Sequence, residues 1–190
     1  MEEKLRQRPS TSIKIVLFGP ESSGKSTLAE ELANYYHAPL VPEYMRIYLQ
    51  KKWDDEHKIC EPEDIIPISV GQMQMENKVA SANPELIICD TNLLQIKVYS
   101  EAYYNEYCDP QLLKPALNNQ YHLYFLMYID TPWTPDDLRD KPDDREGMFQ
   151  RFKNELDRHN KNYVLLEGSI ETRLQKAIKE IDALIKKAEK

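Results

Sequence analysis

Two hydrophobic patterns alternate along this chain. Short runs of consecutive apolar residues are followed by longer stretches in which apolar side chains return every three or four positions. The first pattern indicates buried strands and the second indicates amphipathic helices. The predicted strands are residues 12–18, 39–42, 86–91, 122–129 and 163–166. The predicted helices are a stretch ending near residue 36, residues 44–52, 63–82, 93–104, 110–118 and 145–160, and a last helix capped by Ser169.

The predicted strands are apolar throughout, so both faces of their sheet should be covered. Their alternation with helices predicts an α/β fold, a parallel sheet with helices on both faces. We expect one such domain over residues 12–189, preceded by a frayed tail over residues 1–11. Ligands of parallel sheets bind beyond the carboxyl ends of the strands. We therefore expect the loop after the first strand, Glu43, Asp90 and Asp130 at one edge.

The loop after the first strand spans residues 19–26 and matches the phosphate-binding pattern G-x-x-x-x-G-K-[ST]. Its two glycines let the backbone curl around a phosphate, and the following helix directs its positive end at the same anion. We expect Lys25 to reach the β- and γ-phosphates of ATP and the Ser26 hydroxyl to bind Mg²⁺. The residues expected to bind ATP are Gly19, Glu21, Ser22, Ser23, Gly24, Lys25, Ser26 and Thr27. Because RecA-type recombinases have a similar loop, the reaction must be inferred from the rest of the chain.

The composition narrows the choice of partners. The net charge is −7 and no basic stripe stands out, so we do not expect nucleic acid as a partner. Cys60, Cys89 and Cys108 are far apart and fit neither a zinc site nor a disulfide framework, which indicates a reducing compartment. We find no signal peptide and no apolar run of membrane-spanning length. We therefore expect a cytoplasmic protein that acts on a small molecule and has no membrane partner.

Acids at the strand ends supply the candidate chemistry. Asp90 can hold Mg²⁺, directly or through water, although a helix cap or a turn residue would give the same pattern. Glu43 can grip or deprotonate a substrate hydroxyl opposite the γ-phosphate, unless it is a surface acid that starts a helix. Arg46 fits a contact with phosphate, a contact with Asp90 or a solvated helix face equally well.

The stretch over residues 131–144 is rich in proline and aspartate and predicts a mobile loop. Trp133 lies beside two prolines there, where it either offers its face to a flat ring or plugs the base of the loop. Arg139, Arg145 and Arg151 recur through this acidic region. Arginines in such a loop can close over a phosphate group during its transfer. If they instead pair with the neighbouring aspartates, their role is structural. We expect at least one of them to be catalytic.

Four motifs, in order, resemble the ribosylnicotinamide kinase domain of NadR-type bacterial proteins of NAD metabolism. They are Gly-Pro-Glu-Ser-Ser-Gly-Lys-Ser at 19–26, Pro-Glu-Tyr-Met-Arg at 42–46, Cys-Asp-Thr-Asn-Leu-Leu at 89–94 and Trp-Thr-Pro-Asp-Asp-Leu-Arg at 133–139. Arg145 also fits the resemblance, which covers the chain from about residue 12 to residue 189.

The resemblance implies a P-loop kinase fold with strand order 2-3-1-4-5 and a lid over about residues 131–148. It also implies ATP- and Mg²⁺-dependent phosphorylation of the 5′-hydroxyl of nicotinamide riboside to nicotinamide mononucleotide, a step of NAD salvage. The catalytic residues that it implies are Lys25, Glu43, Asp90, Arg139 and Arg145. Those implied to contact the substrate are Glu43, Tyr44, Arg46, Asp90 and Trp133, and those for the metal are Ser26 and Asp90. NadR-type proteins also carry an adenylyltransferase domain and a DNA-binding segment. We expect neither activity here, because about ten residues precede the first predicted strand and no H-x-G-H motif is present.

Two alternatives stay open. One is a kinase for another nucleoside or a nucleotide, although the acidic edge favours a neutral or cationic acceptor over a monophosphate. The other is a RecA-like or AAA-type ATPase switch. The sequence leaves undecided whether Glu43 or Asp90 is the base, whether ATP or GTP is preferred, and what the oligomeric state is. The turn at residues 168–170 is where similar folds usually hold adenine.

Overall fold

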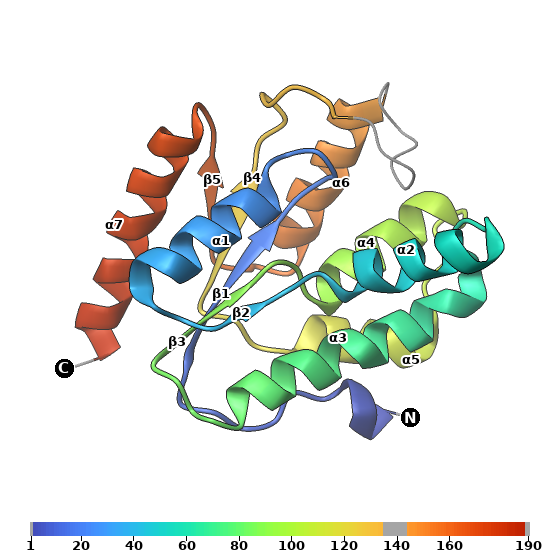
Figure 1. Cartoon of the computed structure of the whole chain (residues 1–190), viewed down its shortest axis with the longest axis horizontal. Coiled ribbons are helices and arrows are strands. Elements are labelled where there is room, and N and C mark those ends of the chain that lie inside the picture. Colours follow the sequence, from blue (N-terminus) through green and yellow to red (C-terminus); the bar gives the residue numbers. More distant parts are fainter. Residues whose placement is uncertain (1, 135–143, 189–190) are drawn as a thin grey trace.

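The computed structural model describes residues 2–134 and 144–188 and contains a parallel sheet covered by helices (Figure 1). The five strands lie in the order β2-β3-β1-β4-β5, which confirms the predicted topology. The strands are β1 (Ile13–Phe18), β2 (Leu40–Val41), β3 (Leu86–Cys89), β4 (Leu123–Met127) and β5 (Tyr163–Leu166). The helices are η1 (Glu2–Leu5), α1 (Lys25–Tyr36), α2 (Tyr44–Glu56), η2 (Pro62–Asp64), α3 (Ile65–Ala80), α4 (Leu93–Tyr103), α5 (Pro110–Asn118), α6 (Arg145–Arg158) and α7 (Ile170–Ala188).

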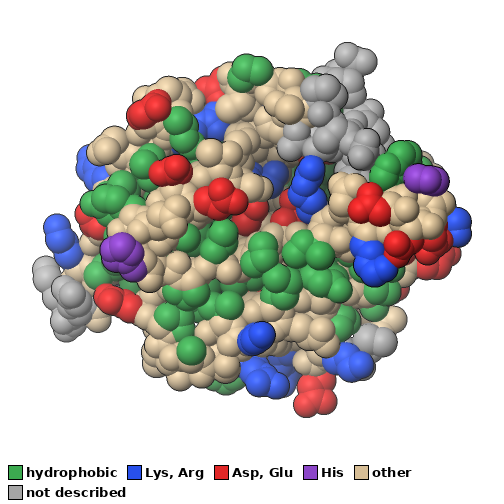
Figure 2. Space-filling model, in the orientation of Figure 1, with side chains coloured by type: hydrophobic (Ala, Val, Ile, Leu, Met, Phe, Trp, Pro, Cys, Tyr) green, Lys and Arg blue, Asp and Glu red, His purple; other side chains and the backbone are tan. Residues whose placement is uncertain are grey.

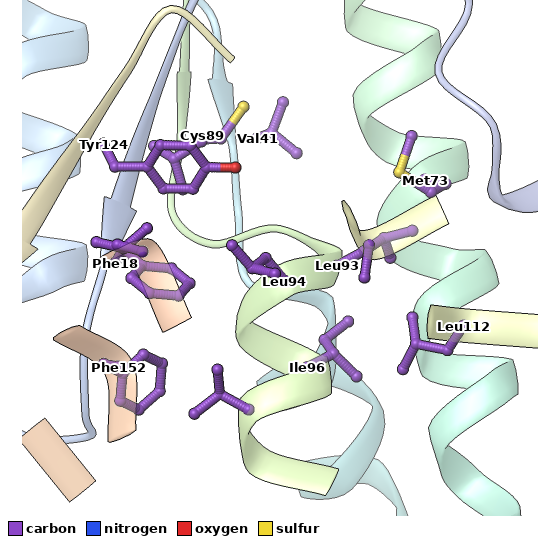
Figure 3. Packing of buried hydrophobic residues seen from close by; sticks show 14 of the residues in the cluster. Phe18, Val41, Met73, Cys89, Leu93, Leu94, Ile96, Leu112, Tyr124 and Phe152 are labelled. Atoms are coloured by element: carbon purple, nitrogen blue, oxygen red, sulfur yellow. The ribbon is translucent and has the colours of Figure 1, made fainter. Parts of the chain in front are cut away.

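The sheet separates two hydrophobic layers. Helices α1 and α7 cover one face, where α7 packs through the predicted stripe of Leu174, Ile178, Ile181 and its neighbours. Helices α3, α4, α5 and α6 cover the other face, where Phe18 packs edge-on against Tyr124 and Phe152 (Figure 3). Successive residues of β1 alternate between the two layers, so every residue of that strand is buried. This explains why the strands are mostly apolar, and the exception in β1, Lys14, pairs with the buried Glu76 at 2.8 Å.

Helix α2 is longer than the predicted span of residues 44–52. It continues to Glu56, four residues beyond the predicted end. Two pairs spaced four residues apart support this extension: Lys51 with Asp55, and Gln50 with Asp54. The helix ends where His57 adopts a left-handed conformation, with φ of 54°. The prediction for α3 was closer, since Pro67 falls in its first turn.

The amino-terminal segment differs from the frayed tail that we expected. Leu5 is completely buried in the layer formed by α3 and α5. Gln7 donates to Glu76 at 2.7 Å, and the Arg8 amide donates to Asn77 at 2.8 Å. The prediction was wrong because one apolar side chain and a few amide contacts with α3 hold a segment whose composition is otherwise polar.

No helix in the part of the chain that the structure describes is long and apolar enough to cross a membrane.

Candidate functional site

The phosphate-binding loop connects β1 directly to α1 at the carboxyl edge of the sheet (Figure 1). Gly19 has φ of 142°, and a Cβ atom there would lie 3.1 Å from the carbonyl oxygen of Met127, so a side chain would be strained in conformation and crowded. The carbonyl oxygen of Pro20 accepts from Ser23 Oγ at 2.7 Å and from Lys25 Nζ at 2.8 Å. These two bonds hold the loop curled around its own backbone, with Lys25 buried at its base.

A cleft of about 370 Å³ opens beside this loop. Figure 2 shows a hollow between the parts of the surface that carry α1 and α2, where side chains of both charges meet. Its phosphate side consists of loop residues: Glu21, Ser22, Ser23, Gly24, Lys25, Ser26 and Thr27. Its opposite side, called the acceptor side below, comes from α2, the segment after it and the end of α4: Glu43, Met45, Arg46, Leu49, Ile59, Cys60, Ile65, Tyr99, Tyr103 and Tyr104.

Asp90 follows β3 and lies behind the phosphate loop, 4% exposed. Burial raises the pKa of its carboxyl group, while the charge of Lys25 and a hydrogen bond with Ser26 oppose this shift. Its Oδ1 atom is buried and has no hydrogen-bond partner. A buried carboxylate oxygen without a donor, beside a serine hydroxyl, is a set of hard oxygen ligands that fits Mg²⁺.

The backbone is strained directly after Asp90. Thr91 has φ of 116°, which is rare for a β-branched residue, and its buried hydroxyl has no partner. Such strain persists only where the surroundings enforce it, and it concentrates at functional sites. Asn92 then caps α4 by accepting from the Gln95 amide at 3.1 Å. The side-chain oxygen of Gln95 accepts from the Gly19 amide at 3.4 Å, so the start of α4 contacts the phosphate loop.

Glu43 and Arg46 both line the cleft, because α2 begins immediately after Glu43. The charge of Arg46 is the smallest of the effects that oppose the burial-driven rise in the pKa of Asp90. Tyr44 is different. Its ring lies against Gly71 of α3, its amide donates to Gln72, and it is not among the residues that line the cleft. The expected contact of Tyr44 with a substrate is therefore not provided by this arrangement, because the first turn of α2 directs the ring toward α3.

Trp133 lies beside the main cleft rather than in its wall. It borders a small adjoining pocket, and the Arg145 guanidinium lies 5.8 Å from its ring centroid. Arg145 donates to the Thr131 carbonyl at 2.8 Å and to the Ser22 carbonyl at 3.2 Å, so it reaches the phosphate loop.

The predictions for Arg151, Arg139 and Asp130 fared differently. Arg151 pairs with the exposed Glu106 at 2.7 Å, a residue after α4 that is not one of the neighbouring aspartates considered above. Arg139 and most of the predicted mobile loop lie outside the described residues. Asp130 does not join the other acids at the cleft, because β4 ends at Met127 and the Asp130 carboxylate pairs with Arg173.

Sequence reasoning missed most of the acceptor side of the cleft. Tyr99, Tyr103 and Tyr104 come from α4 and its end, and the four-residue spacing of the first two was the available signal. Cys60 lies on the same side of the cleft and forms a hydrogen bond with Tyr104, and burial raises the pKa of its thiol. In the described segments, no three His, Cys, Asp or Glu side chains form a group that could hold a metal. A magnesium ion here would depend on Ser26, Asp90 and the oxygens of its ligand.

Known proteins share both the sequence and the architecture of this chain. A family model described as an AAA domain matches residues 14–173. The trifunctional NAD biosynthesis/regulator protein NadR of Salmonella typhimurium is 27% identical over 127 residues, which are 66% of this chain and 30% of that protein. This chain therefore spans less than a third of that relative.

Solved structures relate the fold to P-loop kinases. Crystal structures of NadR protein, one in complex with NR and one with NAD and AMP-PNP, both match with a TM-score of 0.71 at 22% and 21% identity. These matches cover 90% of this chain and 51% and 49% of those chains. Deoxyadenosine kinase from M. mycoides matches with a TM-score of 0.63 and 14% identity, over 90% of this chain and 100% of that chain. At these identities the likeness concerns the fold alone.

Proposed function

Since this chain belongs to the AAA domain family, we propose that it binds ATP and transfers the γ-phosphoryl group to the 5′-hydroxyl of nicotinamide riboside, giving nicotinamide mononucleotide. The observation that carries this proposal is a single cleft with a phosphate loop on one side and an acid, an arginine and three tyrosines on the other. Such a cleft holds a nucleoside hydroxyl next to a triphosphate. The similarity to NadR, one structure of which contains NR, supports the choice of acceptor.

In this proposal the residues on the phosphate side bind and neutralise the triphosphate. Lys25 contacts the β- and γ-phosphates, and Arg145, with Arg139 of the lid, offsets the charge of the group in transfer. Ser26 and Asp90 would hold Mg²⁺, which screens the phosphate charges when bound. The free Oδ1 atom of Asp90 supports this assignment.

The acceptor side orients the sugar and the base. Glu43 accepts the proton of the 5′-hydroxyl or fixes its direction, since it lines the cleft opposite the loop. Tyrosine rings offer flat apolar faces to a cationic pyridinium ring. Beyond Lys25, Arg46 is the only cationic side chain among the described lining residues. This favours a nucleoside over a nucleotide monophosphate, which would need more positive charge.

Two other functions compete with this one. The fold is shared with deoxyadenosine kinase, so another nucleoside is an alternative acceptor. The matching family model is described as an AAA domain, so an ATPase switch, which hydrolyses ATP without an acceptor, is the second alternative. The acceptor side of the cleft favours a kinase, because a switch has no use for a second small-molecule site beside the γ-phosphate.

The decisive experiment incubates the protein with ATP, Mg²⁺ and a panel of nucleosides and measures the mass of the products. We expect a gain of one phosphate on nicotinamide riboside, with Lys25→Ala as the inactive control. Phosphorylation of another nucleoside alone would replace the substrate but keep the reaction. Release of inorganic phosphate without a phosphorylated nucleoside would reject the kinase in favour of an ATPase.

A further inference from the structure

A buried arginine on the last helix has no role in the proposed chemistry. Arg173 lies in the first turn of α7 and is 1% exposed. A guanidinium group is rarely buried this completely unless its donors are satisfied, because removing its charge from water is costly. Its nitrogens donate to the carbonyl oxygens of Ser23 at 2.7 Å, Gly168 at 3.0 Å and Tyr128 at 3.2 Å, and they pair with the Asp130 carboxylate.

The partners of Arg173 come from three separate segments. Ser23 belongs to the phosphate loop, Tyr128 follows β4, and Gly168 lies in the turn between β5 and α7. The second oxygen of Asp130 accepts from the Gly168 amide at 2.6 Å, which joins two of these segments again. Arg173 therefore holds the phosphate loop to the carboxyl ends of two neighbouring strands.

This contact determines the orientation of one peptide group in the loop. A peptide is planar and trans, so its carbonyl and its N–H point in opposite directions. With the Ser23 carbonyl directed at Arg173, the amide of Gly24 is directed away from Arg173. Gly24 lines the cleft. Phosphate loops bind anions through backbone amides that converge on the ligand, so the orientation of this peptide matters for binding.

The preceding peptide is held in the same manner from another segment. The Ser22 carbonyl accepts from Thr131 Oγ1 at 2.7 Å and from Arg145 at 3.2 Å, which orients the amide of Ser23. Side chains from outside the loop thus bind the carbonyls of two consecutive loop residues. A loop held in this way does not have to reorganise when the phosphate arrives, and such preorganisation increases affinity.

We propose that Arg173 is a positioning residue for the nucleotide, which orients the Gly24 amide by binding the Ser23 carbonyl, and that Asp130 positions Arg173. The proposal rests on the binding of a triphosphate in the proposed function and is independent of the acceptor. Arg173 acts through the loop and does not contact the phosphates itself. The substitution of this residue should therefore affect the nucleotide and leave the acceptor site unchanged.

The test compares Arg173→Met, Arg173→Lys and Asp130→Asn with the matched control Tyr36→Phe. Tyr36 also links α1 to α7, through bonds to Asp182 at 2.8 Å and to the Ile178 carbonyl at 3.1 Å, and it has no described contact with the phosphate loop. The dissociation constant of Mg²⁺·ATP is measured by calorimetry on the full chain, together with the thermal midpoint and the KM values for both substrates.

We expect Arg173→Met to raise the dissociation constant of Mg²⁺·ATP by roughly tenfold or more, since a preorganised phosphate contact has such an effect. The KM for the nucleoside should stay within about twofold of the original value. A change of that size corresponds to less binding free energy than one ordinary contact contributes. Arg173→Lys should be intermediate, because a lysine keeps the charge but cannot bind several carbonyls in a fork. Tyr36→Phe should lower the thermal midpoint without changing ATP binding.

An unchanged dissociation constant in folded Arg173→Met would overturn the proposal, and so would an equal loss in Tyr36→Phe. If Arg173→Met does not fold, Asp130→Asn decides: it keeps the guanidinium but removes the carboxylate charge, and ATP binding equal to the original chain would reject the positioning role. Failure of the unsubstituted chain to bind Mg²⁺·ATP would instead reject the proposed function. The two failures are therefore distinguishable.

Discussion

The two sides of the cleft are built in different ways. The phosphate side is one contiguous stretch of residues, and its shape follows from two glycines and the start of α1. The acceptor side combines the start of α2, the segment before α3 and the end of α4. A local backbone motif can be recognised in a sequence, whereas a wall assembled from three separate segments has no motif of its own. The phosphate side therefore indicates the class of cosubstrate, and the acceptor side must determine the substrate.

The contrast between a local phosphate side and an assembled acceptor side is incomplete, because the phosphate side also depends on residues that are distant in sequence. Its carbonyl groups are bound by Thr131, Arg145 and Arg173, which follow it by more than one hundred positions. The ligand-binding groups of the loop are local in sequence, but the contacts that keep them in place are not. Substitutions can separate these contributions, beginning with the largest expected effect.

Removing the cation of the phosphate side should have the largest effect. We expect Lys25→Ala to lower acceptor-dependent ADP formation by roughly 10²–10³-fold or more, because a positioned donor to developing charge is worth that much. The control is Lys51→Ala, an exposed lysine on α2 that pairs only locally with Asp55. Near-normal turnover in Lys25→Ala would mean that this loop does not hold the reacting phosphate.

The next substitution addresses the side that binds the acceptor. We expect Glu43→Gln to lower turnover by roughly 10²-fold, as loss of a general base does, while the affinity for ATP is kept. Glu56→Gln, at the exposed end of the same helix, provides the matched control. Turnover and ATP titrations measure the two effects separately. Full activity of Glu43→Gln would remove this residue as the base and leave Asp90 as the candidate.

Substitution of a tyrosine on the acceptor side should affect binding of the nucleoside and leave binding of ATP unchanged. We expect Tyr103→Leu to raise the KM for the nucleoside by roughly three- to tenfold, because an aromatic contact contributes about 0.5–1.5 kcal/mol. The KM for ATP should not change. Tyr107→Leu is the control, since Tyr107 is 52% exposed and does not line the cleft. An equal rise of both KM values would show that the two sides are not independent.

The smallest effect on activity should come from substitution of Asp64, whose contacts support the acceptor side. Asp64 binds Lys52 at 2.6 Å and Tyr48 at 3.0 Å, and through Lys52 it joins Glu61. We expect Asp64→Asn to lower the free energy of unfolding by about 1–3 kcal/mol at neutral pH, the usual cost of losing a charged hydrogen-bond partner. Chemical denaturation measures this difference, and turnover should change little.

The difference in the free energy of unfolding between the original chain and Asp64→Asn should depend on pH in a definite direction. Burial raises the pKa of Asp64, but hydrogen bonds from Lys52, the Glu61 amide and Tyr48 lower it by more, so the net pKa is lowered. A depressed carboxyl pKa stabilises the folded state above the unfolded value of about 3.9, and this contribution is lost as the pH falls below it. The difference between the original chain and Asp64→Asn should therefore shrink in acid. Asp55→Asn, in an exposed pair, should show little difference at any pH.

The predictions succeeded where the controlling interactions are local. The strands and most helices follow from runs and periods in the sequence, and β5 was predicted residue for residue. The end of α2 was missed although its pairs at four-residue spacing were visible. The amino-terminal segment was missed because its order depends on contacts with α3 and with the connection between α5 and β4, which are distant in sequence.

The sequence by itself determined the phosphate loop, the parallel sheet and the positions of Glu43 and Asp90 after their strands, because backbone conformation and burial depend on neighbouring residues. Only the tertiary structure decided that Tyr44 turns to α3, that the tyrosines of α4 complete the cleft, and that Asp130 serves Arg173. These outcomes depend on how helices pack across the sheet. Side chains that meet in that way are separated by tens of residues, and no local pattern records their contact.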